Sequence, residues 1–101
     1  MKKPIKQLPT RVWRTYRGGK LLDEFFGSEN PKDSDYPEDW ISSFIEATNP
    51  HYVKDEGISK TEGGLITDQV APEDLGPGRT DPALLTKLLD SADRLGIQVH
   101  P

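Results

Sequence analysis

Short stretches of periodic hydrophobic residues alternate along the chain with polar segments rich in glycine and proline. Residues 1–9 form a polar, lysine-rich lead-in, and the alternation in residues 11–16 then predicts a short strand. The apolar residues of 20–26 recur at helical spacing, and Gly27 ends this pattern. The first part of the chain is therefore expected to form one strand and one short helix.

The middle of the chain predicts one buried strand between two polar loops. Residues 27–37 contain many turn-forming residues and little that is apolar, which is typical of a surface loop. In residues 39–47, Trp40 and Phe44 stand at even positions, and the other apolar residues stand at odd positions. A strand here would be buried on both faces. Residues 49–64 are polar and charged, and we expect them to form a long flap.

The last twenty residues allow two interpretations. Apolar residues between positions 84 and 95 form a helical face, with Asp81 as a helix N-cap and Gly96 as the terminator. Residues 97–100 instead alternate as a strand does, and residues 91–94 would suit a turn between two strands. Taken alone, the pattern of residues 84–95 predicts a helix, and the alternation of residues 97–100 is the argument against it.

Composition indicates one small, loop-rich domain. Of the 101 residues only 33% are hydrophobic, and nine are glycine and nine proline. Two Trp, three Tyr and three Phe nevertheless argue against a wholly disordered chain. Because small domains bury a smaller share of their surface than large ones, we do not expect a self-sufficient core.

Charge and hydropathy exclude several classes of function. The net charge of −4 has the wrong sign for a protein that binds nucleic acid through its phosphates. The basic N-terminus is not followed by the apolar run of a signal peptide, and no segment has the length and hydropathy of a membrane span. We therefore expect a cytoplasmic protein that binds neither nucleic acid nor a membrane.

The absence of cysteine restricts the chemistry further. Without cysteine there is no disulfide, no thiolate nucleophile and no sulfur-ligated zinc. Any metal must be held by histidine, carboxylate or amide oxygen.

Gln98 and His100 are the candidate metal ligands. In a strand over residues 97–100 the two-residue side-chain period would place both on one face. An amide oxygen and an imidazole side by side would suit half of a metal site. A Gln-x-His pair is, however, more often an ordinary surface pair. The other histidine, His51, lies in a polar loop and is assigned no role.

Residues 95–101, Leu-Gly-Ile-Gln-Val-His-Pro, together with the leucine-rich residues 84–90 before them, carry a family resemblance. They resemble the segment of type I mannose-6-phosphate isomerases in which a buried strand leads into a Leu-Ser-Ile-Gln-Val-His-Pro motif. The Gln and His of that motif are zinc ligands in the family, and by position they are Gln98 and His100. Gly96 stands where the family usually has serine, so the hydroxyl expected near the sugar is missing.

Two earlier segments are also similar to this family. Residues 37–43, Pro-Glu-Asp-Trp-Ile-Ser-Ser, resemble its Glu-x-Trp-x-x-Ser strand, whose glutamate lies in the sugar pocket and corresponds to Glu38. The simpler alternatives are a solvated carboxylate for Glu38 and a core aromatic for Trp40. Residues 12–22 resemble the N-terminal Trp and Gly-Gly region of bacterial members.

The resemblance covers about residues 11–48 and 82–101, in the family's order. It implies a mainly β fold, with residues 1–101 as the N-terminal, incomplete part of a cupin-type β-sandwich, or jelly roll. One or two short helices and long loops are expected within it. The resemblance also favours strands at 84–89 and 95–100 over the helical interpretation.

By resemblance, the complete protein would interconvert mannose 6-phosphate and fructose 6-phosphate. Zinc would polarise the carbonyl as a Lewis acid, while a separate base moves a proton between C1 and C2. The catalytic residues and the remaining ligands, a Glu and a second His, are expected downstream of Pro101, so we expect the chain alone to be inactive. Two alternatives stay open: a cupin relative that binds sugar or metal without isomerase activity, and an acidic interaction module.

Overall fold

The computed structural model describes residues 4–75, 77–78 and 84–94, which form small antiparallel sheets with little helix. The elements, in chain order, are β1 (Arg11–Val12), α1 (Leu21–Phe25), β2 (Glu38–Ile41), β3 (Lys60–Thr61), β4 (Gly64–Leu65), the 3₁₀ turns η1 (Ile66–Asp68) and η2 (Pro72–Asp74), and β5 (Thr86–Leu89). The prediction of a mainly β chain is therefore confirmed. No helix within these described ranges is long and apolar enough to cross a membrane.

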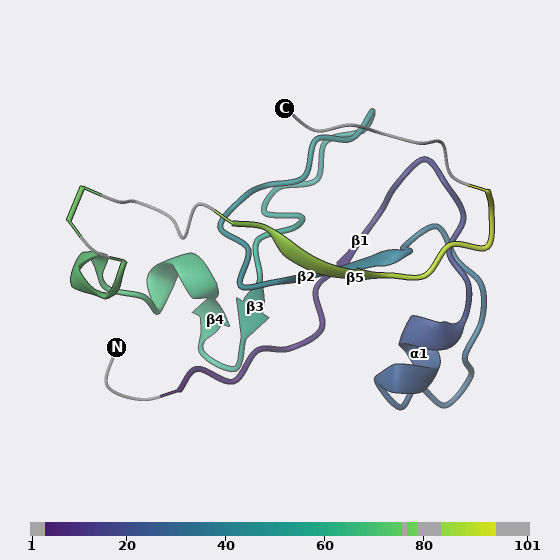
Figure 1. The fold of residues 1–101 in the computed structure, drawn as a ribbon, viewed down its shortest axis with the longest axis horizontal. Helices are drawn as coiled ribbons and strands as arrows, with labels where there is room; N and C mark the ends of the chain where they lie inside the picture. The colour runs from purple at the N-terminus through teal and green to yellow at the C-terminus, as the bar shows by residue number, and fades with distance from the viewer. Residues whose placement is uncertain (1–3, 76, 79–83, 95–101) are drawn as a thin grey trace.

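β2 is the central strand of a three-stranded antiparallel sheet with the order β1–β2–β5. On one side Arg11 pairs with Asp39, and on the other Glu38 pairs with Leu89 and Ile41 with Thr86. β5 thus lies beside β2 although a long stretch of chain separates them (Figure 1). β3 and β4 form a separate two-stranded hairpin.

α1 confirms the helix predicted over residues 20–26. Leu22 is its buried residue, and Asp23 and Glu24 lie in its first turn, where negative charge suits the positive end of the helix dipole. Gly27 follows the helix with a φ of 77°, and its N–H donates to the carbonyl of Glu24 at 3.1 Å. This left-handed glycine is a common way for a helix to end.

The predicted strand over residues 39–47 is wrong beyond Ile41. Ser42 has a φ of 52°, which is incompatible with extended backbone. The side chain of Gln7 stabilises this bend, because its Oε1 accepts the N–H of Ser42 at 2.7 Å and its Nε2 donates to the Ser42 hydroxyl at 2.7 Å. The chain then leaves the sheet, and Ile45 is half exposed.

The other predicted strands are shorter than expected or lie outside the described residues. Residues 11–16 contain only the two-residue β1. β5 confirms a strand within 84–89 and excludes a helix for Thr86–Leu89. The strand predicted over 95–100 lies outside the described part of the chain.

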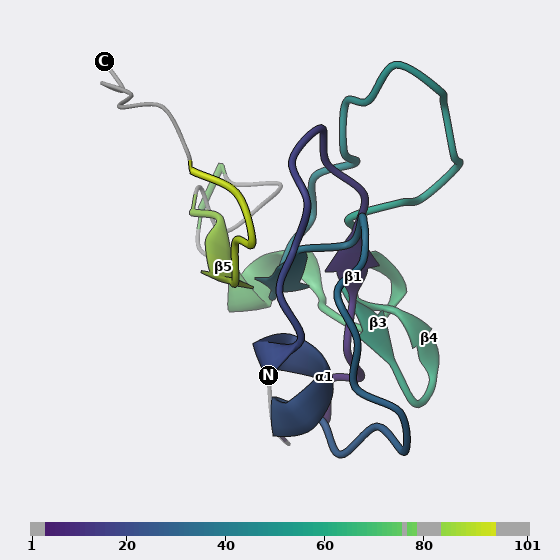
Figure 2. The same cartoon turned by 90° about the vertical axis from the view of Figure 1, so that its right-hand side faces the viewer.

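The apolar core is a small cluster around Trp40 of β2. Val12, Trp40 and Ala47 are buried, and Leu85 packs against them. The prediction of Trp40 as a core aromatic is confirmed. Residues 46–57 form a loop that extends away from the end of the molecule occupied by α1, as Figure 2 shows. Gly57 ends this loop against the Trp40 ring.

Replacing Gly57 with alanine should destabilise the fold more than replacing Gly27. Both glycines have a positive φ, 93° and 77°, so alanine strains the backbone at either position. A Cβ at Gly57 would also lie 2.7 Å from the Trp40 ring, whereas one at Gly27 would meet nothing within 4 Å. In urea denaturation we expect losses of about 2–4 kcal/mol for Gly57→Ala and about 1 kcal/mol for Gly27→Ala. Equal losses would contradict the close contact of Gly57 with Trp40.

Candidate functional site

The carboxylate of Glu38 is the centre of a buried polar cluster. Glu38 is only 4% exposed although it begins β2. The Tyr16 hydroxyl donates to its Oε2 at 2.5 Å, and the Trp40 indole N–H donates to its Oε1 at 2.8 Å. The Lys87 ammonium donates to the same Oε1 at 3.3 Å. The alternative of a solvated carboxylate at a strand end is therefore wrong.

Three separate segments bring these side chains together. Glu38 and Trp40 are two residues apart on β2, so both project from the same face of the sheet. Lys87 is opposite Trp40 in the β2–β5 register, and its ammonium lies 5.3 Å from the centroid of the Trp40 ring. At that distance the cation is attracted to the face of the ring. Tyr16 comes from the loop between β1 and α1.

The partners of Glu38 keep it ionised. Burial is the largest influence on the pKa of Glu38 and raises it, but the hydrogen bonds from Tyr16 and Trp40 and the charge of Lys87 together lower it below its ordinary value. Burial also raises the pKa of the Tyr16 hydroxyl, and the hydrogen bond to Glu38 raises it further. At neutral pH a carboxylate therefore accepts hydrogen bonds from a neutral phenol and an ammonium.

Positive charge exceeds negative charge around this carboxylate. Besides Lys87, the Nε of Arg14 lies 3.9 Å from the Oε2 of Glu38. The side chains of Arg14 and Lys87 are 32% and 34% exposed, so both reach solvent, whereas that of Glu38 is buried. The cluster thus presents cations at the surface above a buried carboxylate.

Of the predicted site residues, only Glu38 lies in the described part of the chain. Gln98 and His100 lie outside it. Within residues 4–75, 77–78 and 84–94, no group of three or more His, Cys, Asp or Glu side chains could hold a metal ion. His51 is exposed, as expected, and its ring meets the Trp13 ring edge-on with centroids 4.7 Å apart.

The chain that follows β5 stays close to the segment that follows Tyr16. Arg17 accepts the N–H of Ala92 at its carbonyl, at 2.8 Å, and donates its own N–H to the Asp93 carboxylate at 2.9 Å. The N–H of Gly19 donates to the carbonyl of Asp90 at 3.1 Å. The residues before the predicted metal motif are therefore anchored beside the loop that supplies Tyr16.

Sequence reasoning missed Tyr16, Arg14 and Lys87 as members of the cluster. Lys87 carried a weak signal, because a lysine in a leucine-rich strand can lay its stem along apolar surface and bring its ammonium to a nearby carboxylate or ring. Tyr16 and Arg14 carried none, because their contacts to Glu38 depend on how a loop folds back.

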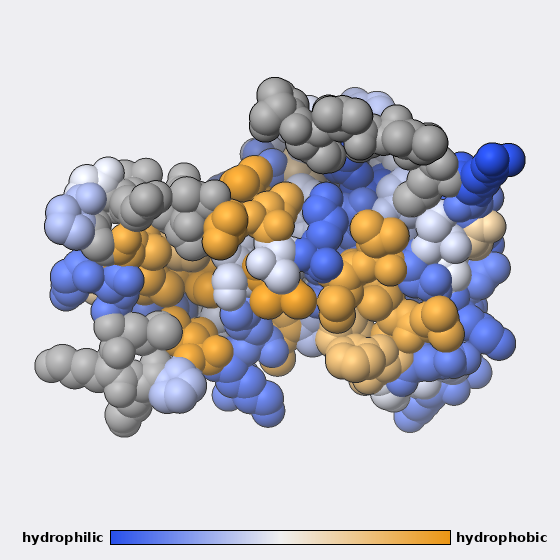
Figure 3. Space-filling model, in the orientation of Figure 1, coloured by the Kyte–Doolittle hydropathy of each residue, from blue (hydrophilic) through white to orange (hydrophobic). Residues whose placement is uncertain are grey.

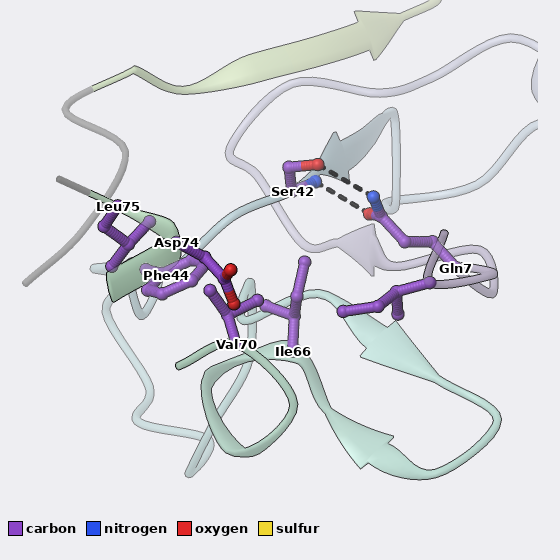
Figure 4. A pocket seen from close by; sticks show the side chains of 8 residues that line it. Gln7, Ser42, Phe44, Ile66, Val70, Asp74 and Leu75 are labelled. Carbon is purple, nitrogen blue, oxygen red and sulfur yellow. Dashed lines mark hydrogen bonds between the residues drawn. The ribbon is translucent and has the colours of Figure 1, made fainter. Parts of the chain in front are cut away.

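A hollow of about 210 Å³ lies between the residues that follow β2 and the η1–η2 region (Figure 4). Phe44, Ile66, Val70 and Leu75 supply its apolar lining. The Gln7 side chain at its rim is hydrogen-bonded to Ser42, as described above. The lining is mostly apolar and includes one carboxylate, Asp74, whereas the buried carboxylate with two cations beside it is Glu38.

Comparison of the chain with protein-family models, with curated proteins and with solved structures finds no match.

Replacing Glu38 with glutamine should destabilise the protein in a pH-dependent way. The variant leaves the cations of Lys87 and Arg14 without their carboxylate, and we expect a loss of about 2–3 kcal/mol at pH 7. The folded pKa of Glu38 lies below its ordinary value, so its contribution is present above about pH 4.3 and is lost as the pH falls through the folded pKa. The difference in free energy of unfolding between wild type and variant, measured by urea denaturation, should therefore become smaller in acid.

Glu24→Gln is the matched control for this experiment. The Glu24 side chain is half exposed, and its Oε1 lies 3.8 Å from the Nζ of Lys20 in an i,i+4 pair. Loss of this ion pair should change the free energy of unfolding by less than about 0.5 kcal/mol. An effect of Glu38→Gln as small as that of Glu24→Gln, or one that is constant with pH, would contradict the buried cluster.

Proposed function

We propose that this chain belongs to a zinc-dependent aldose–ketose isomerase acting on mannose 6-phosphate and fructose 6-phosphate. In this proposal the chain contributes the N-terminal part of a cupin-type jelly roll. The observation that carries the proposal is the Leu-Gly-Ile-Gln-Val-His-Pro motif of residues 95–101, after a leucine-rich strand. The mainly β fold and the pairing of β5 with β2 support it, since the strand of Glu38 and the strand before the motif would both border one site.

The donor chemistry of the motif fits zinc. An amide oxygen from Gln98 and an imidazole from His100 would be two of its protein ligands, and the chain has no thiolate that would favour a softer metal. A catalytic zinc usually has three protein ligands, so at least one more would come from elsewhere in the gene product. When bound, the ion would act as a Lewis acid on the sugar carbonyl.

In this proposal Glu38 positions other groups in the sugar pocket. Its low pKa makes it a weak base at neutral pH, and its oxygens already accept hydrogen bonds from Tyr16, Trp40 and Lys87. It would therefore hold Lys87 and Tyr16 in place, while the partly exposed cations of Lys87 and Arg14 attract an anionic sugar phosphate.

Gly96 favours one second candidate, a cupin relative that binds the sugar or the metal without catalysing isomerisation. The serine hydroxyl that the family places near the sugar is absent at this position. Zinc binding by the complete gene product without isomerase activity would favour this candidate over the enzyme.

Removal of either predicted ligand should lower zinc affinity in the complete gene product. Loss of an outer-shell partner already lowers metal affinity about 10–100-fold, so Gln98→Ala and His100→Ala should lower it by at least that much. The effect should be larger for His100, because imidazole is the stronger donor to zinc. Zinc is measured by mass spectrometry and isomerase activity by a coupled assay.

His51→Ala is the control, since it removes the chain's other histidine from an exposed loop. It should leave zinc content unchanged. Full zinc and full activity in both ligand variants would show that Gln98 and His100 do not bind the metal.

Glu38→Gln should lower turnover while zinc content stays nearly intact. Misplacing Lys87 and Tyr16 by a fraction of an ångström to an ångström would lower kcat by about 10-fold or more, because reacting groups must be held closely. The assay is run at a temperature where the variant is folded, with Glu24→Gln beside it. Loss of zinc from Glu38→Gln would instead indicate that Glu38 supports the metal site.

A further inference from the structure

A groove of about 380 Å³ lies on the face of the sheet from which Asp39 projects. Successive side chains on a strand point to opposite faces, so this face is opposite to that of Glu38. Most of its lining is apolar, and the exceptions are the carboxylate of Asp39 and the amide of Gln7; the apolar residues include Ile5, Leu8, Phe25, Phe26 and Leu88. Hydrophobic side chains gather over β5 and toward α1 on the surface shown in Figure 3. The volume is within the range of small-molecule sites.

Asp39 is the charged residue of the groove, and it is buried with no ion pair among the described residues. It is 5% exposed, and its Oδ1 accepts the N–H of Thr10 at 2.5 Å. None of the ion pairs among the described residues includes it. Arg11, its partner in the β1–β2 register, donates instead to the Asp23 carboxylate at 2.6 Å and to the Tyr36 carbonyl. A buried carboxylate in this condition is costly to keep ionised.

The pKa of Asp39 reflects the same lack of an ion pair. Burial raises it, and neither the Thr10 hydrogen bond nor the charge of Arg11 reverses that shift. A cation that enters the groove would relieve the cost of the buried charge. An apolar body attached to that cation would cover hydrophobic surface that water now contacts, including Phe25, which is 73% exposed, and Leu88, which is 38% exposed.

We propose that this groove binds organic ammonium ions with an apolar body. The ammonium lies on Asp39, and the apolar body lies against Phe25, Phe26 and Leu88. Charge complementarity determines this choice, because a carboxylate in an apolar lining favours a cation and disfavours a sugar phosphate. The site is therefore distinct from the Glu38 cluster and extends beyond the proposed isomerase function.

The test is calorimetric titration of the complete gene product with phenethylamine and with 2-phenylethanol, which replaces the ammonium by a hydroxyl. We expect the amine to bind at least about ten-fold more tightly, because a charge-assisted hydrogen bond replaces a neutral one. The amide resonance of Thr10, whose N–H donates to Asp39, should shift when the amine binds.

Asp39→Asn removes the charge but keeps an acceptor for the Thr10 N–H. It should reduce amine affinity to that of the alcohol, whereas Asp33→Asn, the same change in an exposed loop, should leave it unaltered. Leu88→Ala is the second variant and should weaken both ligands alike, since it shortens the apolar wall without altering the charge.

Four results would overturn the proposal. They are no binding of the amine, equal affinity for amine and alcohol, unchanged amine affinity in Asp39→Asn, and unchanged affinity for both ligands in Leu88→Ala. Circular dichroism of each variant verifies the fold, and the comparison of the two ligands on the unaltered protein does not depend on any variant.

Discussion

A buried carboxylate is stable only when its oxygens are hydrogen-bonded and its charge is paired. Glu38, at the start of β2, is such a carboxylate. Its partners come from segments far apart in sequence, Tyr16 before α1 and Lys87 on β5. Both must reach the carboxylate at once, so the loop after β1 and the strand β5 are held against β2. The antiparallel register, with Lys87 opposite Trp40, meets this condition.

Trp40 joins the polar cluster to the apolar core. Its indole N–H donates to Glu38, while its ring packs beside Val12 and Ala47 and against Gly57. The loop that ends at Gly57 is in turn closed by Glu56, whose carbonyl accepts the N–H of Ala47 at 2.6 Å. Because one side chain belongs to both sets of contacts, the core and the cluster around Glu38 form a single packed unit.

Local patterns predicted those elements whose cause is local. The helix over residues 20–26 depends on the spacing of leucines and phenylalanines and on a terminating glycine, all visible in a short window. The strand within 84–89 was predicted from the family resemblance, because the leucine spacing there taken alone favoured a helix. The end of β2 was not predictable in this way, because the bend at Ser42 is stabilised by Gln7 from the N-terminal segment. A contact between residues so far apart leaves no trace in hydrophobic periodicity.

The candidate site likewise contains residues that the sequence could indicate and residues that it could not. Glu38 was singled out by resemblance, and its burial could not be inferred from a sequence in which it follows a proline and precedes an aspartate. Its partners Tyr16 and Lys87 depend on tertiary contacts. Gln98 and His100 lie outside the described residues, so their role stays a prediction.

Glu38 and Asp39 show how one strand can meet two opposite electrostatic demands. They are neighbours in sequence and almost equally buried, at 4% and 5% exposure. The pKa of Glu38 is nevertheless lowered and that of Asp39 raised, although burial acts in the same direction on both. The difference lies in their partners, because Glu38 receives a phenol, an indole and an ammonium, whereas Asp39 receives one backbone N–H. Since strand alternation points them to opposite faces, the cations of one face cannot neutralise the carboxylate of the other. In the two proposals made above, the two faces of β2 would therefore bind ligands of opposite charge.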